Sequence, residues 1–338
     1  MDLKKIFIKN ACPAKIGGQA VLEGIMMKGE DRTAVVIRKP KGDMHIKIEP
    51  LKEKTKWMKI PVVRGVFIFA DALVTGTKTL LYSAEVLENA EGVEVQEKDK
   101  LTIWLEKRFG EKGALNIMLY FSVILAVIFT VGIFIVAPTW VVNIFSYFTQ
   151  NEVVLNLIEG VLRIIMFVLY VFFISKMKDI QTVFQFHGAE HKCIHCFENG
   201  LELTPDNCKE FETLHPRCGT SFLMFVAILS LLLFSLLGWP NLIWRITSRL
   251  LLIPVIAGLS YELLRWAGKG DSVVVKILSL PGLALQRITT MVPDERQLEV
   301  AIAAMKAVLN KEGPREFVGS TDKDGNLFPE GCTNEFIS

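Results

Sequence analysis

The chain has 338 residues, of which 51% are hydrophobic and 22% charged, and its formal net charge is +2. A mean hydropathy of +0.37 is high for a soluble domain, whereas so many charged residues exclude a chain that lies wholly inside a bilayer. The small net charge gives no sign of nucleic-acid binding, and we expect no nucleic-acid partner. The sequence does not open with a positively charged region followed by a short apolar stretch and a cleavage site, so we expect no signal peptide.

Residues 1–60 are predicted to form a small cytosolic β module. Ala34–Arg38 and His45–Glu49 are short runs that favour strands, and Lys39–Gly42 between them is a turn signal. The preceding Ile16–Gly29 contains four glycines but no phosphate-loop pattern, so turn or close-packing glycines are favoured over a phosphate site.

Residues 61–112 are predicted to hold an interfacial or re-entrant helix and a linker. Val62–Glu88 has a broad apolar face, but Arg64, Asp71 and Lys78 interrupt it. A helix of this kind favours the membrane surface over a full crossing.

Residues 113–266 are predicted to form a membrane core of about four spanning helices. The apolar stretches are Ala114–Ala137, Val153–Ser175, Ser221–Trp239 and about Leu242–Trp266, each close to the length that a span requires. Pro138 marks the end of the first. The links 138–152 and 240–241 have no Lys or Arg, whereas the loop 176–220 has five. The positive-inside rule therefore predicts two helical hairpins, with this loop and both termini in the cytosol.

Charged residues inside the predicted spans need compensation. Glu159 and Arg163 are spaced for an i,i+4 pair, and Arg249 is expected at a similar depth. An uncompensated charge there costs on the order of 3 kcal/mol. We predict a structural ion network between the second and fourth spans. A conduction path, or a segment Leu242–Arg249 lying flat on the outer surface, remains an alternative.

Residues 267–338 are predicted to form cytosolic helices and a mobile tail. Val273–Asn310 divides into two helical segments around Pro293 and Asp294, and the second, Glu295–Leu309, is amphipathic. The polar tail after Glu312 is expected to be mobile.

The segment FHGAEHKCIHCFENG, at Phe186–Gly200, carries the candidate chemistry. On a helix, His187 and His191 lie one turn apart and can chelate one divalent ion. HGAEH also has the order H-x-x-E-H, in which the glutamate, here Glu190, acts as the base that deprotonates water. His215 and Cys218 are the candidates to complete the ligand set, and Glu198 is a further carboxylate option.

Four of the five histidines and four of the six cysteines lie between His187 and Cys218, which indicates a metal. Because the cytosol keeps thiols reduced, ligation is favoured over disulfides. One alternative is a closed structural zinc held by Cys193, Cys196, Cys208 and Cys218. Mixed His, Cys and carboxylate ligands favour zinc, with iron or manganese left open.

Six motifs along Gly17–Leu309 resemble the YqhQ-like family of bacterial membrane proteins. They are GGQAVLEGIMM at Gly17, PVVRG at Pro61, FHGAEHK at Phe186, HPRCGTSF at His215, YELLRW at Tyr261 and PGLALQRITTMVPDERQLEVAI at Pro281. The resemblance implies a predicted metal-dependent enzyme of unknown reaction in the bacterial cell membrane. It carries a motif over to His187, Glu190, His191, His215, Arg217 and Cys218, and similar residues usually stand at Cys196 and Glu198. Cys193 and Cys208 do not belong to the family pattern, which weakens the four-cysteine site.

We therefore predict a membrane-embedded, metal-dependent hydrolase, with a peptidase as one form, at the cytosolic face. Glu190 would move the proton, and Arg217 would hold an anionic group or the oxyanion. The alternatives are a scaffold or assembly factor with a structural metal, and a transporter that uses Glu159, Arg163 and Arg249. The expected partners are the bilayer and a membrane-protein or peptide substrate, and self-association into a homo-oligomer is left open.

Overall fold

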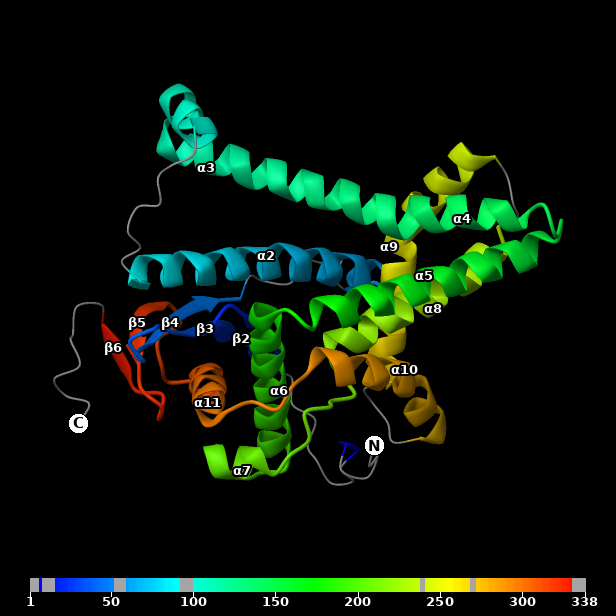
Figure 1. Cartoon of the computed structure of the whole chain (residues 1–338). Coiled ribbons are helices and arrows are strands. Elements are labelled where there is room, and N and C mark those ends of the chain that lie inside the picture. Colours follow the sequence, from blue (N-terminus) through cyan, green and yellow to red (C-terminus); the bar gives the residue numbers. More distant parts are fainter. Residues whose placement is uncertain are drawn as a thin grey trace. The chain divides into compact units, whose positions relative to one another are not determined.

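The computed structural model describes residues 6–7, 16–51, 59–91, 100–237, 241–267 and 272–329. These residues divide into two compact units, each assembled from segments far apart in the sequence. The sheet unit comprises residues 1–91, 170–226 and 254–338, and the helical unit comprises 92–169 and 227–253. This division differs from the four consecutive segments that we predicted. Figure 1 shows the elements of both units.

An antiparallel sheet of six strands, in sequence order, forms the centre of the sheet unit. The strands are β1 (Gly17–Val21), β2 (Gly24–Lys28), β3 (Arg32–Arg38), β4 (Met44–Pro50), β5 (Phe317–Thr321) and β6 (Leu327–Pro329). The predicted hairpin is confirmed, because β3 pairs with β4 and Ile37 lies opposite His45. Its turn contains Gly42 at φ 95°, a conformation that favours glycine.

Part of the tail that we expected to be mobile is ordered instead. β5 pairs with β4, with Phe317 opposite Ile48, and β6 then pairs with β5. Polar composition misled the prediction, because backbone hydrogen bonds along the edge of β4 can order a segment with few apolar side chains. Residues 330–338 lie outside the described part of the chain.

Helices cover both faces of the sheet. Ile25 and Met27 of β2 pack against α6 (Lys178–Glu198) and α11 (Glu295–Leu309). Met26, between them, packs on the other face against Tyr82 and Val86 of α2 (Val63–Glu91). This alternation follows from the two-residue period of a strand. Figure 1 shows α2 and α11 on opposite sides of the strands.

The remaining helices include most of the apolar sequence. They are α3 (Lys100–Val131), the π-helical η2 (Gly132–Val136), α4 (Ala137–Phe145), α5 (Glu152–Ile174), α7 (Pro205–Lys209), α8 (Gly219–Ser235), α9 (Leu242–Ala267) and α10 (Val273–Thr289). The predicted helical segments on either side of Pro293 are confirmed as α10 and α11. α3 begins within the predicted linker, and Gly110 at φ 74° and ψ 166° kinks it.

Among the described residues, four helices are long and apolar enough to cross a membrane. They span Val63–Ala90, Tyr120–Phe145, Glu152–Ile174 and Ile243–Ala267. Large apolar side chains such as Phe121 and Phe129 are more than half exposed, which suits contact with lipid. These helices support a membrane protein, as the sequence predicted.

The identity of the four candidate spans differs from our expectation. α2 fulfils the criteria of length and composition, although we had assigned it to the interface or a re-entrant position. α8 has 17 residues and falls short of the length of a full span; Trp239 and Pro240, the predicted end of that span, lie outside the described residues. The first span also continues past Pro138, because this residue stands in the first turn of α4, where proline is tolerated.

The predicted ion network is present in the helical unit. Glu159 of α5 accepts a hydrogen bond of 2.7 Å from Arg163 and forms an ion pair with Arg249 of α9. Arg163 Nε donates to the carbonyl of Phe134 at 2.8 Å. Phe134 lies in η2, where the π-helical turn interrupts the regular α-helical hydrogen-bond pattern. The network therefore joins the second and fourth predicted spans.

Candidate metal centre

α6 brings the H-x-x-E-H residues into the interior of the sheet unit. Its Gly188 allows the backbone at Met291 to approach so closely that a Cβ at 188 would lie 2.0 Å from the Met291 carbonyl oxygen. Met291 in turn donates its N–H to the carbonyl of Phe184 at 2.9 Å. The glycine inside HGAEH thus fixes the segment after α10 against the first half of α6.

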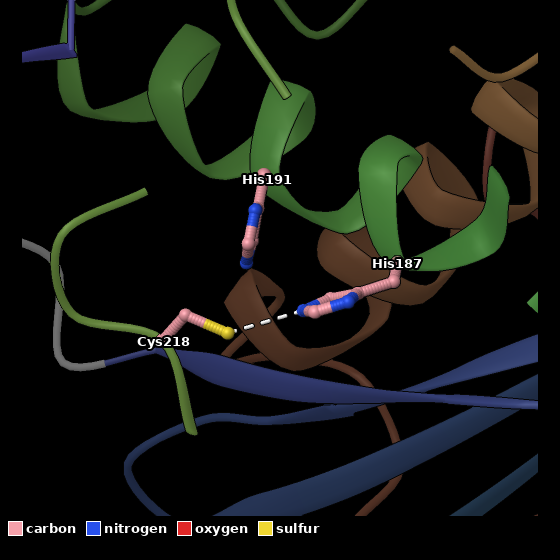
Figure 2. Close-up of side chains that lie close together, drawn as sticks. All are labelled: His187, His191 and Cys218. Atoms are coloured by element: carbon pink, nitrogen blue, oxygen red, sulfur yellow. Dashed lines mark hydrogen bonds between the residues drawn. The ribbon is translucent and has the colours of Figure 1, made fainter. Parts of the chain in front are cut away.

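His187, His191 and Cys218 place one ligand atom each within 4.8 Å of one another. Nε2 of His187 lies 3.1 Å from Sγ of Cys218, and the two imidazole centroids are 4.4 Å apart. Figure 2 shows the three side chains converging on one space, two from α6 and one from the segment before α8. The sequence predicted His187 and His191 as a chelating pair and both His215 and Cys218 as candidates to complete it; of these two, only Cys218 joins this group.

The hydrogen bonds of the two imidazoles suit metal ligation. Nδ1 of His187 lies 2.8 Å from the carbonyl oxygen of Thr289, and Nδ1 of His191 lies 2.5 Å from that of Thr213. A carbonyl can only accept, so each Nδ1 carries the proton, and Nε2 of the neutral ring keeps its lone pair. Nε2 of His191 is buried without a hydrogen-bond partner. A histidine that binds a metal usually donates its other ring N–H to a carbonyl or carboxylate in this way, which fixes its tautomer and orientation.

A second group adjoins the first and contains a residue that sequence analysis missed. Ligand atoms of His195, Glu198 and His215 also lie within 4.8 Å of one another, and the ring centroids of His191 and His215 are 5.5 Å apart. His195 stands four residues after His191, so the repeated i,i+4 spacing of His187, His191 and His195 was the available signal.

Hydrogen bonding makes the second group less suited to hold an ion. Nε2 of His195 donates to the Leu214 carbonyl at 3.0 Å. Nδ1 of His215 accepts the Arg217 N–H at 3.3 Å, which leaves the proton of its neutral ring on Nε2, 3.6 Å from Glu198 Oε2. The Arg217 guanidinium forms an ion pair with Glu198. We interpret this group as a network that anchors the segment carrying Cys218.

Gln286 of α10 strengthens the same anchor. Its side-chain oxygen accepts the N–H of His215 at 2.8 Å, and its amide nitrogen donates to the His215 carbonyl at 2.8 Å. The Gln286 side chain is fully buried, so each of these bonds is shielded from water. α10 thus fixes the backbone three residues before Cys218.

Glu190 lies beside the first group and faces β1. It is 5% exposed and accepts a hydrogen bond from the backbone of Gly18, and its carboxyl carbon would lie 2.8 Å from a Cβ at that position. Burial raises the pKa of Glu190, while the nearby His187 and His191 act in the opposite direction. The glycine-rich start of the sheet is therefore a site of close packing, as predicted.

The four-cysteine zinc site is not formed. Cys193, Cys196 and Cys208 are fully buried in the hydrophobic core, whereas Cys218 lies with the imidazoles. Cys196 Sγ contacts the Glu202 carbonyl at 3.4 Å and belongs to neither group of candidate ligands. Hydrogen bonding with Cys208, together with burial, raises the pKa of Cys196, so this thiol stays protonated. Both thiols of the CxxC motif, Cys193 and Cys196, therefore lie in the core.

The electrostatics of Cys218 are the opposite. Burial alone raises its pKa, but the adjacent His187 and His191 hold it well below the ordinary value of a thiol. For His187 burial acts in the other direction and lowers the pKa, because the charged form of an imidazole is the protonated one. The charge and hydrogen bond of Cys218 outweigh burial and raise the pKa of His187 to about 9. Without a metal the two residues form a thiolate–imidazolium pair. In the second group, burial and His215 lower the pKa of His195 to about 3.

The first group fits a divalent metal. It offers two imidazole nitrogens and one thiolate, and the buried Nε2 of His191 has the lone pair that a cation would take up. Three protein ligands leave one position open for water or substrate. A nitrogen and sulfur donor set suits zinc among the common divalent metals.

Fold and site together give a mostly helical protein with four candidate membrane spans and a candidate metal centre next to a small antiparallel sheet. Residues 60–311 match the model of the family described as protein of unknown function DUF1385, and the chain belongs to this family. It is 33% identical over 314 residues to the uncharacterized protein YqhQ of Bacillus subtilis, covering 91% of this chain and 96% of that protein. The resemblance predicted from the motifs is confirmed. No solved structure matches the chain.

Proposed function

We propose that the protein is a membrane-embedded, zinc-dependent hydrolase that acts at the cytosolic membrane face on a membrane protein or peptide. The observation that carries this proposal is the convergence of His187, His191 and Cys218 beside the buried carboxyl of Glu190. Excess Lys and Arg in the loop 176–220 and in both terminal regions supports the cytosolic orientation.

His187, His191 and Cys218 would hold the ion, which supplies Lewis-acid polarisation of a carbonyl and activation of water when bound. Glu190 would accept a proton from the attacking water and pass it to the leaving group. Its raised pKa, caused chiefly by burial, suits such a role, because a base works best when its pKa lies near the working pH. Thr289 and Thr213 orient the two imidazoles through their carbonyls.

Arg217 takes a different place in this proposal from the catalytic role that we predicted. Its guanidinium forms an ion pair with Glu198, and its backbone N–H binds His215. The ion pair holds the segment 215–218 against α6, and the backbone contact fixes the conformation within that segment. We therefore propose that Arg217 positions Cys218.

A hydrolase with Cys218 as the nucleophile is the second candidate. The 3.1 Å contact between Cys218 Sγ and His187 Nε2, with His187 oriented by Thr289, is also the arrangement of a thiol nucleophile and its base. Chelation separates the two candidates, because it would abolish metal-dependent turnover but leave a cysteine nucleophile intact.

The test compares the full-length protein, reconstituted with zinc in phosphatidylglycerol–phosphatidylethanolamine vesicles, with two variants. The probe is a library of quenched fluorescent peptides. Glu190→Gln should keep its zinc and lose roughly 100-fold or more in turnover, while Glu202→Gln, an exposed glutamate after α6, should behave as wild type. Turnover that survives Glu190→Gln removes Glu190 from the mechanism. If the zinc-loaded wild type cleaves no peptide, and chelation only lowers its thermal stability, the scaffold alternative is favoured.

A further inference from the structure

α10 exposes a continuous apolar stripe. Val273, Val274 and Ile277 are 72%, 56% and 59% exposed, and Leu280 is 39% exposed. Spacings of three and four residues place these side chains on one side of the helix. A patch of this kind on the surface of a protein marks a site of interaction.

The opposite side of α10 packs against two of the apolar helices. Val275 belongs to a cluster with Phe225 of α8 and Leu263 of α9. Gly282 approaches the first turn of α8 so closely that a Cβ would lie 2.5 Å from Ser221 Oγ. The apolar stripe therefore lies on the side of α10 that faces away from α8 and α9, while the opposite side of the helix packs against both.

The chain connection favours the bilayer as the occupant of this stripe. The candidate span in α9 ends at Ala267, and α10 begins at Val273. Six residue steps reach at most about 20 Å, so α10 begins close to the end of that span. Basic residues on α10 itself flank the stripe: Lys276 lies next to Ile277, and Arg287 lies in the last turn of the helix. An apolar stripe bordered by basic residues is typical of a helix at an anionic membrane surface.

We propose that α10 lies in the plane of the membrane surface, with Val273, Val274, Ile277 and Leu280 among the lipids. The same helix supplies Gln286 to His215 and the Thr289 carbonyl to His187. The contact with the bilayer and the metal centre would therefore share one element, which places the centre beside the lipid headgroups. The lipid contact itself does not depend on hydrolysis, but a substrate delivered from the membrane would rest on the proposed function.

Photocross-linking tests this placement without any assay of activity. The full-length protein in phosphatidylglycerol–phosphatidylethanolamine vesicles would carry p-benzoylphenylalanine in place of Ile277, and mass spectrometry would identify the adducts. The positive control is Phe173, 66% exposed on a candidate span, and the negative control is Asp206 of α7, whose side chain is 94% exposed. Position 277 should give lipid adducts at a yield similar to that of 173 and severalfold above that of 206. Adducts with a second protein chain, or a lipid yield no higher than at 206, would overturn the proposal.

Discussion

The carboxyl group of Glu190 lies directly against the backbone of Gly18, where a Cβ would come within 2.8 Å of Glu190 Cδ and of the Met26 carbonyl oxygen. Gly18 also donates its N–H to this carboxyl. The first strand of the sheet thus positions the proposed base, although Gly18 and Glu190 are far apart in the sequence. This relationship gives a structural reason for the second glycine of GGQAVLEG.

Adding one methyl group at position 18 should disturb this contact. Gly18→Ala must displace the Glu190 carboxyl or the adjacent strand, at a cost of about 1–3 kcal/mol, as expected for overpacking. Gly17→Ala is the matched control, because no atom lies within 4 Å of a Cβ there. Thermal unfolding of the two variants measures the difference, and equal midpoints would show that Glu190 does not require Gly18.

Metal removal should expose one reactive thiol among the four described cysteines. Cys218 is partly exposed, and its lowered pKa makes it a thiolate in the metal-free protein. Cys193, Cys196 and Cys208 are buried and should resist the reagent. Iodoacetamide followed by peptide mapping should label Cys218 after chelation and spare it once zinc is restored. Labelling of Cys218 that zinc does not reduce would argue against its role as a ligand.

Metal affinity should depend on pH through His187. Its pKa of about 9, set by Cys218 against the effect of burial, means that a cation must displace a proton from this imidazole at neutral pH. Raising the pH removes the competing proton, so affinity should rise by about tenfold per unit up to about pH 9 and then level off. Cobalt(II) titrations of the metal-free protein, followed by absorbance, test this. An affinity independent of pH would mean that His187 is not protonated or is not a ligand.

The ion network of the helical unit should be structural. The side chain of Glu159 is 2% exposed between Arg163 and Arg249, so Glu159→Gln leaves buried guanidinium charge uncompensated and should cost about 3–5 kcal/mol. Glu152→Gln, at the exposed start of α5, changes the same group and should cost less than about 1 kcal/mol. Denaturant unfolding in mixed micelles compares them. A Glu159→Gln protein as stable as Glu152→Gln would contradict the structural role of the network.

Local patterns predicted much of the fold, because they depend on neighbours in the sequence. The β3–β4 hairpin followed from its strand-forming runs and Gly42, and α11 followed from its amphipathic spacing after the break at Pro293 and Asp294. The pairing of β5 with β4 could not be predicted, since it joins residues far apart in the chain and uses backbone rather than side-chain signals. α2 has the length and composition of a span, yet it also packs on the sheet through Tyr82 and approaches α9 at Gly65. These contacts join residues far apart in the chain, so the apolar pattern of α2 could not predict them.

The candidate site was predictable in its residue types but not in its grouping. The spacing of His187 and His191 predicted their common face on a helix. His215, Glu198 and Cys218 were included as candidate ligands because they lie nearby in the sequence. Only the structure separates Cys218, which faces the imidazoles, from His215 and Glu198, which lie together and each contact Arg217. Cys196 could equally have faced either side, because a CxxC spacing does not decide between core and ligand.

Elemental analysis of the full-length protein purified in detergent tests the central assignment most directly, with wild type beside His191→Ala, Cys218→Ser and the core variant Cys208→Ser. We predict about one zinc per wild-type chain, as one group of three ligands implies, and loss of that zinc in His191→Ala and Cys218→Ser but not in Cys208→Ser. A wild-type protein without metal, or zinc retained by both ligand variants, would contradict the assignment.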